Sequence, residues 1–493
     1  MNLLSVYLLS DFKSLKPFEE RIRFDDTGLN EFDPICLVGL NGSGKSHFLE
    51  LIAEGFMMAE YFVRNVKLPQ STSPLYFEIE YSLTATGDST YYKLSNTKKD
   101  KLKLYILQDD EYQEKNSIEY NDLPKKILGY SSGLNETLSS SFYEILNDFS
   151  EKLSLSANDP SKYYDIVDNV RMTYLDHNTN LLLVVSNLAS ENSSKVIQDY
   201  TNLKELISFK IEINKKIRVK VKTNAQIDGI LEQLQKFSYD GGDNINEDYI
   251  GFDFIGGKAF SNAIEKVFGG TVKFFEALMV LNNLNSLAIS KKYKKWMSDN
   301  RKKGVLIKMP EVPEEDRFFN ITNIKFRTKD DQIIGYEGLS DGEHQLVQTL
   351  GALSIIEEPD TLFLFDEPDT HYNPEWRSRL FAEYSAVCKG RNQEIILSTH
   401  SPFIVSSVKK HSVFHFVRNK GTTITNPTFQ TFGCSIDIIL RRLFNKKTMT
   451  PSLPVQVMVE IAEKSRDEII ENMDMFGESH SKAMLYKKLE ELK

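Results

Sequence analysis

The sequence predicts an α/β fold built on a parallel sheet, and three segments support this prediction. Residues 35–38 form an apolar run that leads into a glycine-rich loop, and residues 47–58 then place apolar side chains at helical spacing. Residues 361–365 form a second apolar run, which ends in two carboxylates. A third run, at residues 395–397, ends in Ser-Thr-His. Short uninterrupted apolar runs are typical of strands buried in a parallel sheet, so each segment predicts such a strand.

The composition limits the class of protein. A length of 493 residues fits two to four domains, or one core with a large insertion. A hydrophobic content of 41% excludes a chain that is disordered throughout. The net charge of -10 excludes a uniformly basic coat for nucleic acid but allows a local basic patch. The separated Cys36, Cys388 and Cys434 argue against a disulfide framework and a zinc site. We find no signal peptide and no apolar window long enough for a membrane helix, which predicts a cytoplasmic protein.

The glycine-rich loop matches the pattern Gly-x-x-x-x-Gly-Lys-Ser in full. Glycines let the backbone fold with its amides pointing inward, and the following helix directs its positive dipole end at the same place, so the loop fits a phosphate chain. The pattern predicts that Lys45 reaches the β- and γ-phosphates and that Ser46 ligates Mg²⁺. A chance glycine-rich turn before a helix is the alternative. The predicted nucleotide-binding residues of the loop are Asn41, Gly42, Ser43, Gly44, Lys45 and Ser46.

Two carboxylates follow the apolar run at residues 361–365. Asp366 lies where a Walker B aspartate would hold Mg²⁺. Glu367 is then placed to orient or deprotonate an attacking water, which predicts a catalytic role. The alternative is a solvated turn at the end of a strand.

A short polar motif, Leu339-Ser340-Asp341-Gly342-Glu343, precedes that run. Ser340 is a good N-cap, and Glu343 three residues later fits a capping box, so a plain helix start is one interpretation. The motif also resembles the ABC signature, which usually reads Leu-Ser-Gly-Gly-Gln. In that superfamily the serine and the glycine amides contact the γ-phosphate that is held by the opposite subunit. The resemblance therefore implies a binding role in trans for these five residues.

The fourth motif is the histidine that follows the strand at residues 395–399. In ABC proteins a histidine here contacts the γ-phosphate, which implies a catalytic role for His400; a structural histidine is the alternative. The four motifs occur in the order that an ABC-type ATPase head requires, and each lies on the required element. The sequence is therefore identified as an ABC-type ATPase head, with two lobes brought together in one chain and with ATP and Mg²⁺ as cofactors.

Two further segments are assigned on the same resemblance, whereas the Q-loop glutamine is left unplaced. Residues 369–374 resemble the D-loop, and Asn373 lies where many ABC proteins carry aspartate. The sequence pattern of this segment is typical of the DNA-repair and phage-defence branch. Asp11-Phe12-Lys13-Ser14 resembles the opening of that branch, which implies that Lys13 approaches the phosphates; a surface lysine is the alternative. Gln108 follows a strand-like run and is a candidate Q-loop glutamine on that ground alone.

The motifs divide the chain into four segments. The insertion between the motifs shows no sustained heptads, so we expect a compact globular or short helical-hairpin insertion, in contrast to the long coiled coils of cohesin-type ATPases. The segments are an N-terminal ATPase lobe at 1–137, a mostly helical insertion at 138–317, a C-terminal ATPase lobe at 318–446 and a helical tail at 447–493.

Residues 129–136, 339–345 and 398–402 resemble the Septu-type, PtuA-like ATPases of bacterial defence operons, which also occur beside retrons. The resemblance implies a homodimer that sandwiches ATP, and it is compatible with a higher oligomer, with nucleic acid or with a retron complex. It also implies a separate HNH nuclease as partner. Only 49 residues follow Phe444, without an Asp-x-Asp pair, so we predict no built-in nuclease. The alternative function is a DNA-repair or chromosome-handling ATPase that binds DNA directly.

Two lysine-rich segments are candidates for contact with nucleic acid. Residues 291–303 carry seven positive charges and one acid, Asp299, with Tyr293 and Trp296 interleaved. This pattern fits phosphate contacts combined with base stacking, and it also fits a solvated basic helix. Residues 210–220 predict an amphipathic strand pair with a charged outer face.

Overall fold

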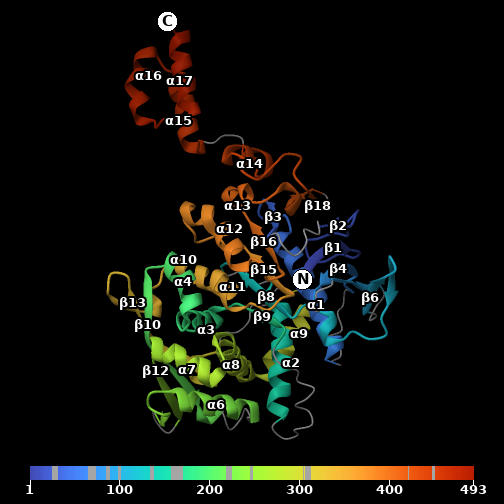
Figure 1. Ribbon diagram of the computed structural model, residues 1–493. Coiled ribbons are helices and arrows are strands. Elements are labelled where there is room, and N and C mark those ends of the chain that lie inside the picture. Colours follow the sequence, from blue (N-terminus) through green and yellow to red (C-terminus); the bar gives the residue numbers. More distant parts are fainter. Residues whose placement is uncertain are drawn as a thin grey trace. The chain divides into compact units, whose positions relative to one another are not determined.

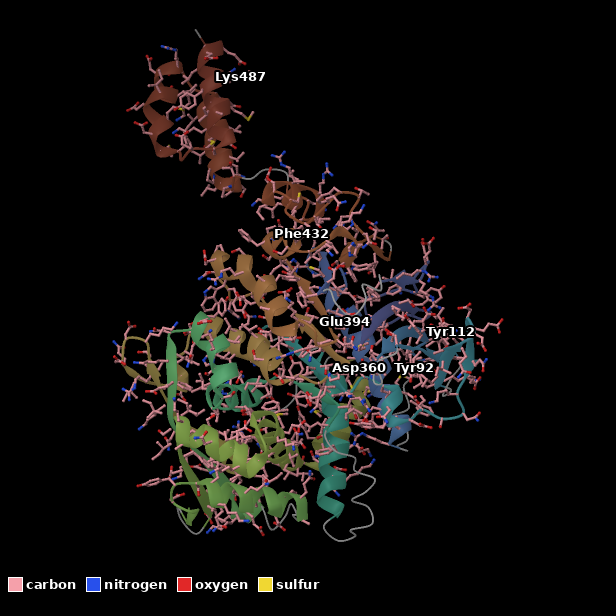
Figure 2. The ribbon with its side chains drawn as sticks, viewed as in Figure 1. Tyr92, Tyr112, Asp360, Glu394, Phe432 and Lys487 are labelled. Carbon is pink, nitrogen blue, oxygen red and sulfur yellow. The ribbon has the colours of Figure 1, made fainter. Side chains whose placement is uncertain are left out.

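The chain forms two compact units, Met1–Phe432 and Gly433–Lys493, in a computed structural model. Phe432, labelled in Figure 2, ends the first unit. The helical tail expected from residue 447 is thus part of a unit that begins at Gly433, and residues 447–449 lie outside the described residues. The structure describes residues 1–24, 32–64, 74–84, 89–97, 102–133, 138–156, 170–217, 225–244, 248–303, 305, 312–419, 421–446 and 450–492.

A seven-stranded sheet carries the predicted motifs (Figure 1). All neighbouring pairs in it are parallel except β17 with β18. Strands β3 and β15 are buried along their whole length, which their uninterrupted apolar sequences predicted. In spatial order the strands are β18 (Thr422–Thr425), β17 (Val413–Arg418), β3 (Ile35–Gly39), β16 (Gln393–Thr399), β15 (Thr361–Asp366), β8 (Lys126–Ser131) and β9 (Met172–Tyr174).

The register of this sheet brings the motif-bearing strand ends together. Asp366, the last residue of β15, pairs with Ser398 of β16 on one side and with Ser131 of β8 on the other. Thr399 of β16 pairs with Val38 of β3. The carboxyl ends of parallel strands lie at one edge of a sheet, so the loops after β3, β15 and β16 converge there, which is where open α/β sheets bind ligands.

Helix α1 (Lys45–Val63) follows the glycine-rich loop and packs against β3, β15 and β16. It begins directly after Gly44, which has a φ of 106° in the left-handed region that glycine adopts without strain. The helix extends beyond the predicted range of 47–58. The predicted apolar face is buried and includes Phe48, Leu49, Leu51, Ile52 and Phe56.

An antiparallel sheet of six strands contains the first strand of the chain. Gln108 ends β6 in this sheet, where it pairs with Glu111 and is exposed. The strand beside β15 is instead β8, so the structure gives Gln108 no place in the edge that the motif loops share. The sheet order is β2 (Ile22–Arg23), β1 (Asn2–Leu8), β4 (Phe77–Leu83), β5 (Thr90–Asn96), β6 (Leu102–Gln108) and β7 (Glu111–Glu114).

The insertion is rich in helices, as predicted, but part of it forms a second antiparallel sheet together with strands of the C-terminal lobe. The prediction of a strand pair at residues 210–220 is wrong for the part of this range that the structure describes, because β10 ends at Asn214. The Asn214 carboxamide accepts from Ile217 N at 3.2 Å, which turns the chain out of the sheet, and residues 218–220 lie outside the described residues. The sheet order is β11 (Asp243–Asn244), β12 (Tyr249–Ile255), β10 (Leu203–Asn214), β13 (Phe319–Thr328) and β14 (Ile333–Gly335).

Within its described residues the insertion is compact, as expected. Its longest helix, α2, has 18 residues. One aromatic cluster joins α6, α7 and α8 to the sheet through Phe209, Phe237, Phe254, Phe260, Phe268 and Phe274. The helices are α2 (Ser139–Ser156), α3 (His177–Leu188), α4 (Glu191–Tyr200), α6 (Ala225–Phe237), α7 (Lys258–Phe268), α8 (Thr271–Asn283) and α9 (Lys291–Lys302).

The C-terminal lobe and the second unit supply the remaining helices. The second unit has a hydrophobic core of its own, made by Met458, Ile461, Ile469, Met473, Phe476 and Leu485. No helix in the described ranges is both long and apolar enough to cross a membrane. The lobe contains α10 (Asp341–Leu346), the π-helical η6 (Val347–Gly351), α11 (Ala352–Ile355), α12 (Pro374–Cys388) and α13 (Pro402–Ser406). The second unit contains α14 (Ile436–Leu443), α15 (Ser452–Ala462), α16 (Arg466–Asn472) and α17 (His480–Glu491).

Candidate nucleotide site

The glycine-rich loop between β3 and α1 requires its glycines for conformation and for packing. Gly39, Gly42 and Gly44 have φ values of 149°, 74° and 106°. A Cβ atom on Gly39 would lie 2.4 Å from the Phe416 carbonyl oxygen, and one on Gly44 would lie 2.7 Å from the Leu15 side chain. The loop therefore needs the left-handed conformations that glycine adopts without strain, and larger residues would disturb it; that its amides point inward stays a prediction.

Lys45 is the first residue of α1, and its side chain turns back into the loop. The residue is 5% exposed. Its Nζ donates to the carbonyl oxygens of Gly39 at 3.0 Å and of Leu40 at 3.4 Å. Burial lowers the pKa of this ammonium, while Glu367 and Asp366 nearby raise it. The charge thus lies at the centre of the predicted phosphate cradle, at the sheet edge that carries the two carboxylates.

Asp366 and Ser46 lie next to each other, as a shared Mg²⁺ site requires. The Asp366 side chain is buried at the end of β15 and accepts from Ser398 Oγ at 2.5 Å. Burial raises its pKa, and hydrogen bonds from the hydroxyls of Ser398 and Ser46 lower it. A carboxylate and a hydroxyl are oxygen ligands suited to Mg²⁺, which keeps several waters and takes further oxygens from phosphates.

Glu367 follows Asp366 with a φ of 53°, which is the left-handed region. A non-glycine residue there costs about 1–3 kcal/mol and persists only when its surroundings hold it. Here the Glu367 amide donates to Ser398 O at 3.2 Å and to Ser398 Oγ at 3.1 Å. Its carbonyl oxygen accepts from Thr370 Oγ1 at 3.0 Å and from Gln345 Nε2 at 3.3 Å. These bonds fix the direction in which the carboxylate leaves the strand.

His400 lies between the lysine of the loop and the second carboxylate. Its Nε2 is 3.0 Å from Lys45 Nζ and 3.1 Å from Glu367 Oε1. The hydrogen bond with His400 holds the pKa of Glu367 below its usual value, against the opposing effect of burial. Glu367 is therefore ionised near neutral pH, as an acceptor of a proton must be. Three of the predicted residues, from three motifs, are thus brought together.

The signature motif forms a complete capping box at the start of α10. Ser340 Oγ accepts from Glu343 N at 3.3 Å, and the Glu343 carboxylate accepts from Ser340 N at 2.9 Å. Leu339 and Gly342 are buried, whereas Ser340 and Asp341 are exposed. The helix-start interpretation is therefore confirmed, and the exposed residues leave the role in trans as a prediction.

The D-loop residues have structural contacts within the chain. Asn373 is the N-cap of α12, where its Oδ1 accepts from Trp376 N at 2.9 Å. Asp369 is buried and accepts from Thr399 Oγ1 at 2.8 Å. Arg377 donates to the Asp369 carbonyl oxygen at 3.1 Å. The turn after β15 is therefore held on both sides, and Asn373 remains exposed.

Lys13 lies beside α1, where its ammonium pairs with the buried Glu50. The next residue, Ser14, places its Oγ 2.5 Å from His47 Nδ1. Burial, with Lys13 and Arg418 nearby, lowers the pKa of His47 to about 4. Lys13 is thus near the first turns of α1, but its recorded partner is a carboxylate, and its approach to a phosphate stays a prediction.

Two residues of the β17–β18 hairpin contact the loop, although no sequence motif marks them. Arg418 Nη1 donates to the Gly42 carbonyl oxygen at 3.1 Å. Thr422 Oγ1 donates to the Ser43 carbonyl oxygen at 3.3 Å. The hairpin therefore supports the outer side of the loop, and Arg418 adds a positive charge there.

The residues present fit a nucleotide with Mg²⁺. Within the described residues, Ser43 Oγ is buried without a hydrogen-bond partner, so one polar atom of the loop is left for a ligand to satisfy. In the described part of the chain no group of three or more His, Cys, Asp or Glu side chains could hold a metal. A Mg²⁺ site of the P-loop kind needs no such group, because one or two protein ligands combine with phosphates and waters.

The looped strand end, the buried lysine and the paired carboxylates on a parallel sheet define a P-loop ATPase domain of α/β fold. The chain belongs to the family described as AAA domain, putative AbiEii toxin, Type IV TA system, whose model matches residues 35–406. That match includes the loop, the signature, both carboxylates and His400.

Comparison with individual proteins gives more distant similarities. Protein ea59 of Escherichia phage lambda is 29% identical over 107 residues, which are 22% of this chain and 20% of that protein. The match thus spans a fifth of this relative's length. The SMC head domain from Thermotoga maritima is 13% identical, with 87% of this chain and 100% of that chain covered and a TM-score of 0.32. An SMC head with coiled coil and joint from Pyrococcus yayanosii is 13% identical, with 90% and 99% covered and a TM-score of 0.35.

Proposed function

We propose that this protein binds and hydrolyses ATP, and that this cycle switches another protein in a bacterial anti-phage defence complex. The observation that carries the first part is the Glu367 carboxylate held beside His400, which itself contacts Lys45 of the loop. The second part rests on the resemblance to Septu-type ATPases. The family description, which names a putative toxin of a toxin–antitoxin system, is in keeping with it.

In the proposed reaction the phosphates of ATP lie in the loop, and Lys45 Nζ exchanges its carbonyl contacts for β- and γ-phosphate oxygens. The oxygen of a water forms a bond to the γ-phosphorus, and the bond from that phosphorus to the β–γ bridging oxygen breaks. Glu367 orients this water and accepts its proton, while His400 contacts the γ-phosphate. Mg²⁺ at Ser46 and Asp366 would neutralise charge on the β- and γ-oxygens.

The proposal places the other half of each ATP site on a second copy of the chain. Ser340 and Asp341 are exposed at the start of α10, where the positive end of the helix dipole favours an anion. In the proposed homodimer, Ser340 of one copy reaches the γ-phosphate held by Lys45 of the other, so two ATP molecules are sandwiched. Higher oligomers would be built from such dimers.

The test of the ATPase is nucleotide binding and phosphate release by three proteins. The native protein should bind ATP with Mg²⁺ and release phosphate. Lys45→Ala should lose ATP binding, because it removes the charge inside the loop. Lys389→Ala, which changes an exposed lysine at the end of α12, should behave like the native protein. Native protein that neither binds nor hydrolyses ATP would contradict the proposal.

The proposed target of the switch is a separate HNH nuclease. The test is co-purification with the product of the adjacent gene, followed by mass measurement with and without ATP. An HNH protein that joins the complex would support the proposal. A membrane permease in that gene position would contradict it.

Direct binding of nucleic acid is the second candidate function, and helix α9 favours it. Lys291, Lys292, Lys295 and Trp296 are all exposed on it. The rings of Tyr293 and Trp296 lie 5.2 Å apart, so an aromatic surface adjoins the charges. Lysines can contact phosphates while a ring stacks on a base, which is the usual combination in single-strand binding.

Not every lysine of α9 is available for such contacts. Lys294 packs against the protein, with a side chain 13% exposed and its Nζ 3.5 Å from Glu151. The side chains of Arg301 and Lys302 lie outside the described residues. The test is binding of single- and double-stranded probes across a salt series by the native protein and by Trp296→Ala. Nucleic-acid binding predicts affinity that falls with salt in log-log form, and a salt-independent or absent signal would end this candidate.

A further inference from the structure

The side chain of Gln345 makes three hydrogen bonds next to the site, and no motif assigns it a role in catalysis. The residue lies on α10, five positions after Ser340, and is 2% exposed. Its Nε2 donates to Tyr130 Oη at 3.0 Å and to the Glu367 carbonyl oxygen at 3.3 Å. Its Oε1 accepts from His371 N at 2.9 Å. One buried carboxamide therefore joins the signature helix to β8, to the end of β15 and to the D-loop.

The bond to Glu367 acts on a strained backbone. Glu367 has a φ of 53°, so its conformation depends on the hydrogen bonds at its amide and carbonyl groups. Ser398 supplies the bonds at the amide, and Gln345 and Thr370 supply those at the carbonyl. The peptide plane fixes where the Glu367 side chain starts, so losing one carbonyl donor would let the carboxylate move relative to His400.

The bond to His371 holds the next part of the same turn. His371 lies between Asp369 and Asn373 in the D-loop, and its amide is directed at Gln345. A Cβ on Gly342 would lie 3.1 Å from the His371 carbonyl oxygen, so α10 and this turn are also in close contact. A movement of α10 would therefore displace the turn at two points, Glu367 and His371.

We infer that Gln345 is a positioning residue for ATP hydrolysis, which ties the signature helix to the backbone of Glu367 and to the D-loop. This inference rests on the proposed ATPase function. In the proposed dimer, contact of Ser340 with the nucleotide of a second copy fixes the position of α10. Through its hydrogen bond to the Glu367 carbonyl oxygen, Gln345 then holds the water-activating carboxylate of its own chain in place. Gln345 does not touch ATP, so it affects turnover and leaves nucleotide affinity unchanged.

The experiment compares steady-state kinetics of Gln345→Met with those of a matched control, Gln348→Met. Gln348 lies one turn later, and its Nε2 donates to the carbonyl oxygens of Leu175 at 3.4 Å and Asp176 at 3.1 Å, away from Glu367. Gln345→Met should lower kcat by about 10- to 100-fold with KM for ATP within about 3-fold of native, since misplaced catalytic groups cost rate rather than binding. Gln348→Met should keep kcat within about 2-fold.

A second comparison separates positioning from a general structural role. In the Glu367→Gln background, Gln345→Met should cause no further loss of rate, because residues that act as one unit are non-additive. Gln345→Glu provides a second variant should the methionine protein fail to fold. It keeps an acceptor for His371 N and loses the donor to Glu367, so it should show the same kcat loss.

The outcomes distinguish this inference from the function on which it rests. If the native protein hydrolyses ATP and a folded Gln345→Met or Gln345→Glu protein has the same kcat, only the role of Gln345 is overturned. Equal losses from Gln345→Met in the native and the Glu367→Gln backgrounds, or a raised KM with unchanged kcat, also overturn it. Native protein that binds ATP but never hydrolyses it overturns the ATPase proposal and this inference together.

Discussion

His400 Nε2 lies 3.0 Å from Lys45 Nζ and 3.1 Å from Glu367 Oε1, so one ring nitrogen is within hydrogen-bond distance of both the lysine of the loop and the carboxylate that follows β15. Lys45 begins the helix that follows the loop after β3, and His400 and Glu367 directly follow β16 and β15; these three strands are neighbours in that order in the parallel sheet. A γ-phosphate that replaced the contact between Lys45 and His400 would lie next to Glu367. This arrangement leads to the first prediction.

Glu367→Gln should lower kcat for ATP hydrolysis by about 100-fold or more while ATP binding persists. The substitution keeps the size and the polar contacts of the side chain but removes its ability to accept a proton, and general-base contributions are typically about 10²–10⁴-fold. Phosphate release and the mass of the complex with ATP check it. Glu375→Gln, at an exposed glutamate of α12, is the control with native activity. Normal hydrolysis by Glu367→Gln would show that Glu367 is not the base.

Arg418→Ala should weaken ATP binding and leave kcat close to native. Arg418 donates to the Gly42 carbonyl oxygen and adds positive charge beside the loop, but it is on the far side of β3 from Glu367. Loss of one exposed charged hydrogen bond corresponds to about 1 kcal/mol, or roughly a fivefold rise in KM. Kinetics over a range of ATP concentrations check this split. Arg442→Ala, in the second unit, is the control, and a fall in kcat at unchanged KM for Arg418→Ala would be evidence against it.

Gly39→Ala should destabilise the first unit by about 3 kcal/mol. The new Cβ would lie 2.4 Å from the Phe416 carbonyl oxygen in β17, and the φ of 149° strains any L side chain. Gly229→Ala is the control, because a Cβ there meets nothing within 4 Å and alanine favours its helix, α6, by about 0.5–1 kcal/mol. Denaturant unfolding measures both. Equal stability of Gly39→Ala and the native protein would show that the loop can shift away from β17.

Glu394 should make a contribution to stability that is lost as the pH rises from about 5 to about 8, opposite in sign to the contribution of His47 below about pH 6.5. Glu394, labelled in Figure 2, is partly buried on β16, accepts from Leu3 N at 3.1 Å, and has a pKa raised by desolvation to about 8. The unfolded chain releases this proton near pH 4.5 while the folded protein keeps it, so ionisation favours unfolding throughout this window. Glu394→Gln cannot ionise at this position, so it should remove this contribution to the dependence of stability on pH. Thermal unfolding from pH 5 to 8 measures it, with Glu375→Gln as a control that keeps the native slope.

The local parts of the site were predictable because each depends on a few consecutive residues. The glycine-rich loop, the two carboxylates and the capping box at Ser340 are set by spacing and by backbone preference. The structure shows the left-handed glycines, the end of β15 at Asp366 and the complete capping box, and the binding and catalytic roles stay predictions. The strands were predictable for a similar reason, since an apolar run such as residues 361–365 indicates a strand that is buried on both faces. Assignments that depend on a second molecule, among them the homodimer and the nuclease partner, stay predictions.

Contacts between distant segments were not predictable in the same way. No sequence motif connects Arg418 with Gly42, or Gln345 with Glu367 and Tyr130. Gln108 was a candidate only because it follows a strand-like run, and the sheet in which that run pairs places it elsewhere. Likewise, β10 of the insertion pairs with β13 of the C-terminal lobe, although they are separate segments of the sequence.

The sequence by itself determined which residues can hold phosphate, Mg²⁺ and a proton, because those capacities belong to side-chain type and local spacing. Only the tertiary structure decided that His400 lies within hydrogen-bond distance of both Lys45 and Glu367 and that Glu367 adopts a left-handed backbone held from α10. The physical reason is that the order of strands in the sheet, and the hydrogen bonds across it, depend on the packing of the whole unit. No short stretch of sequence contains that information.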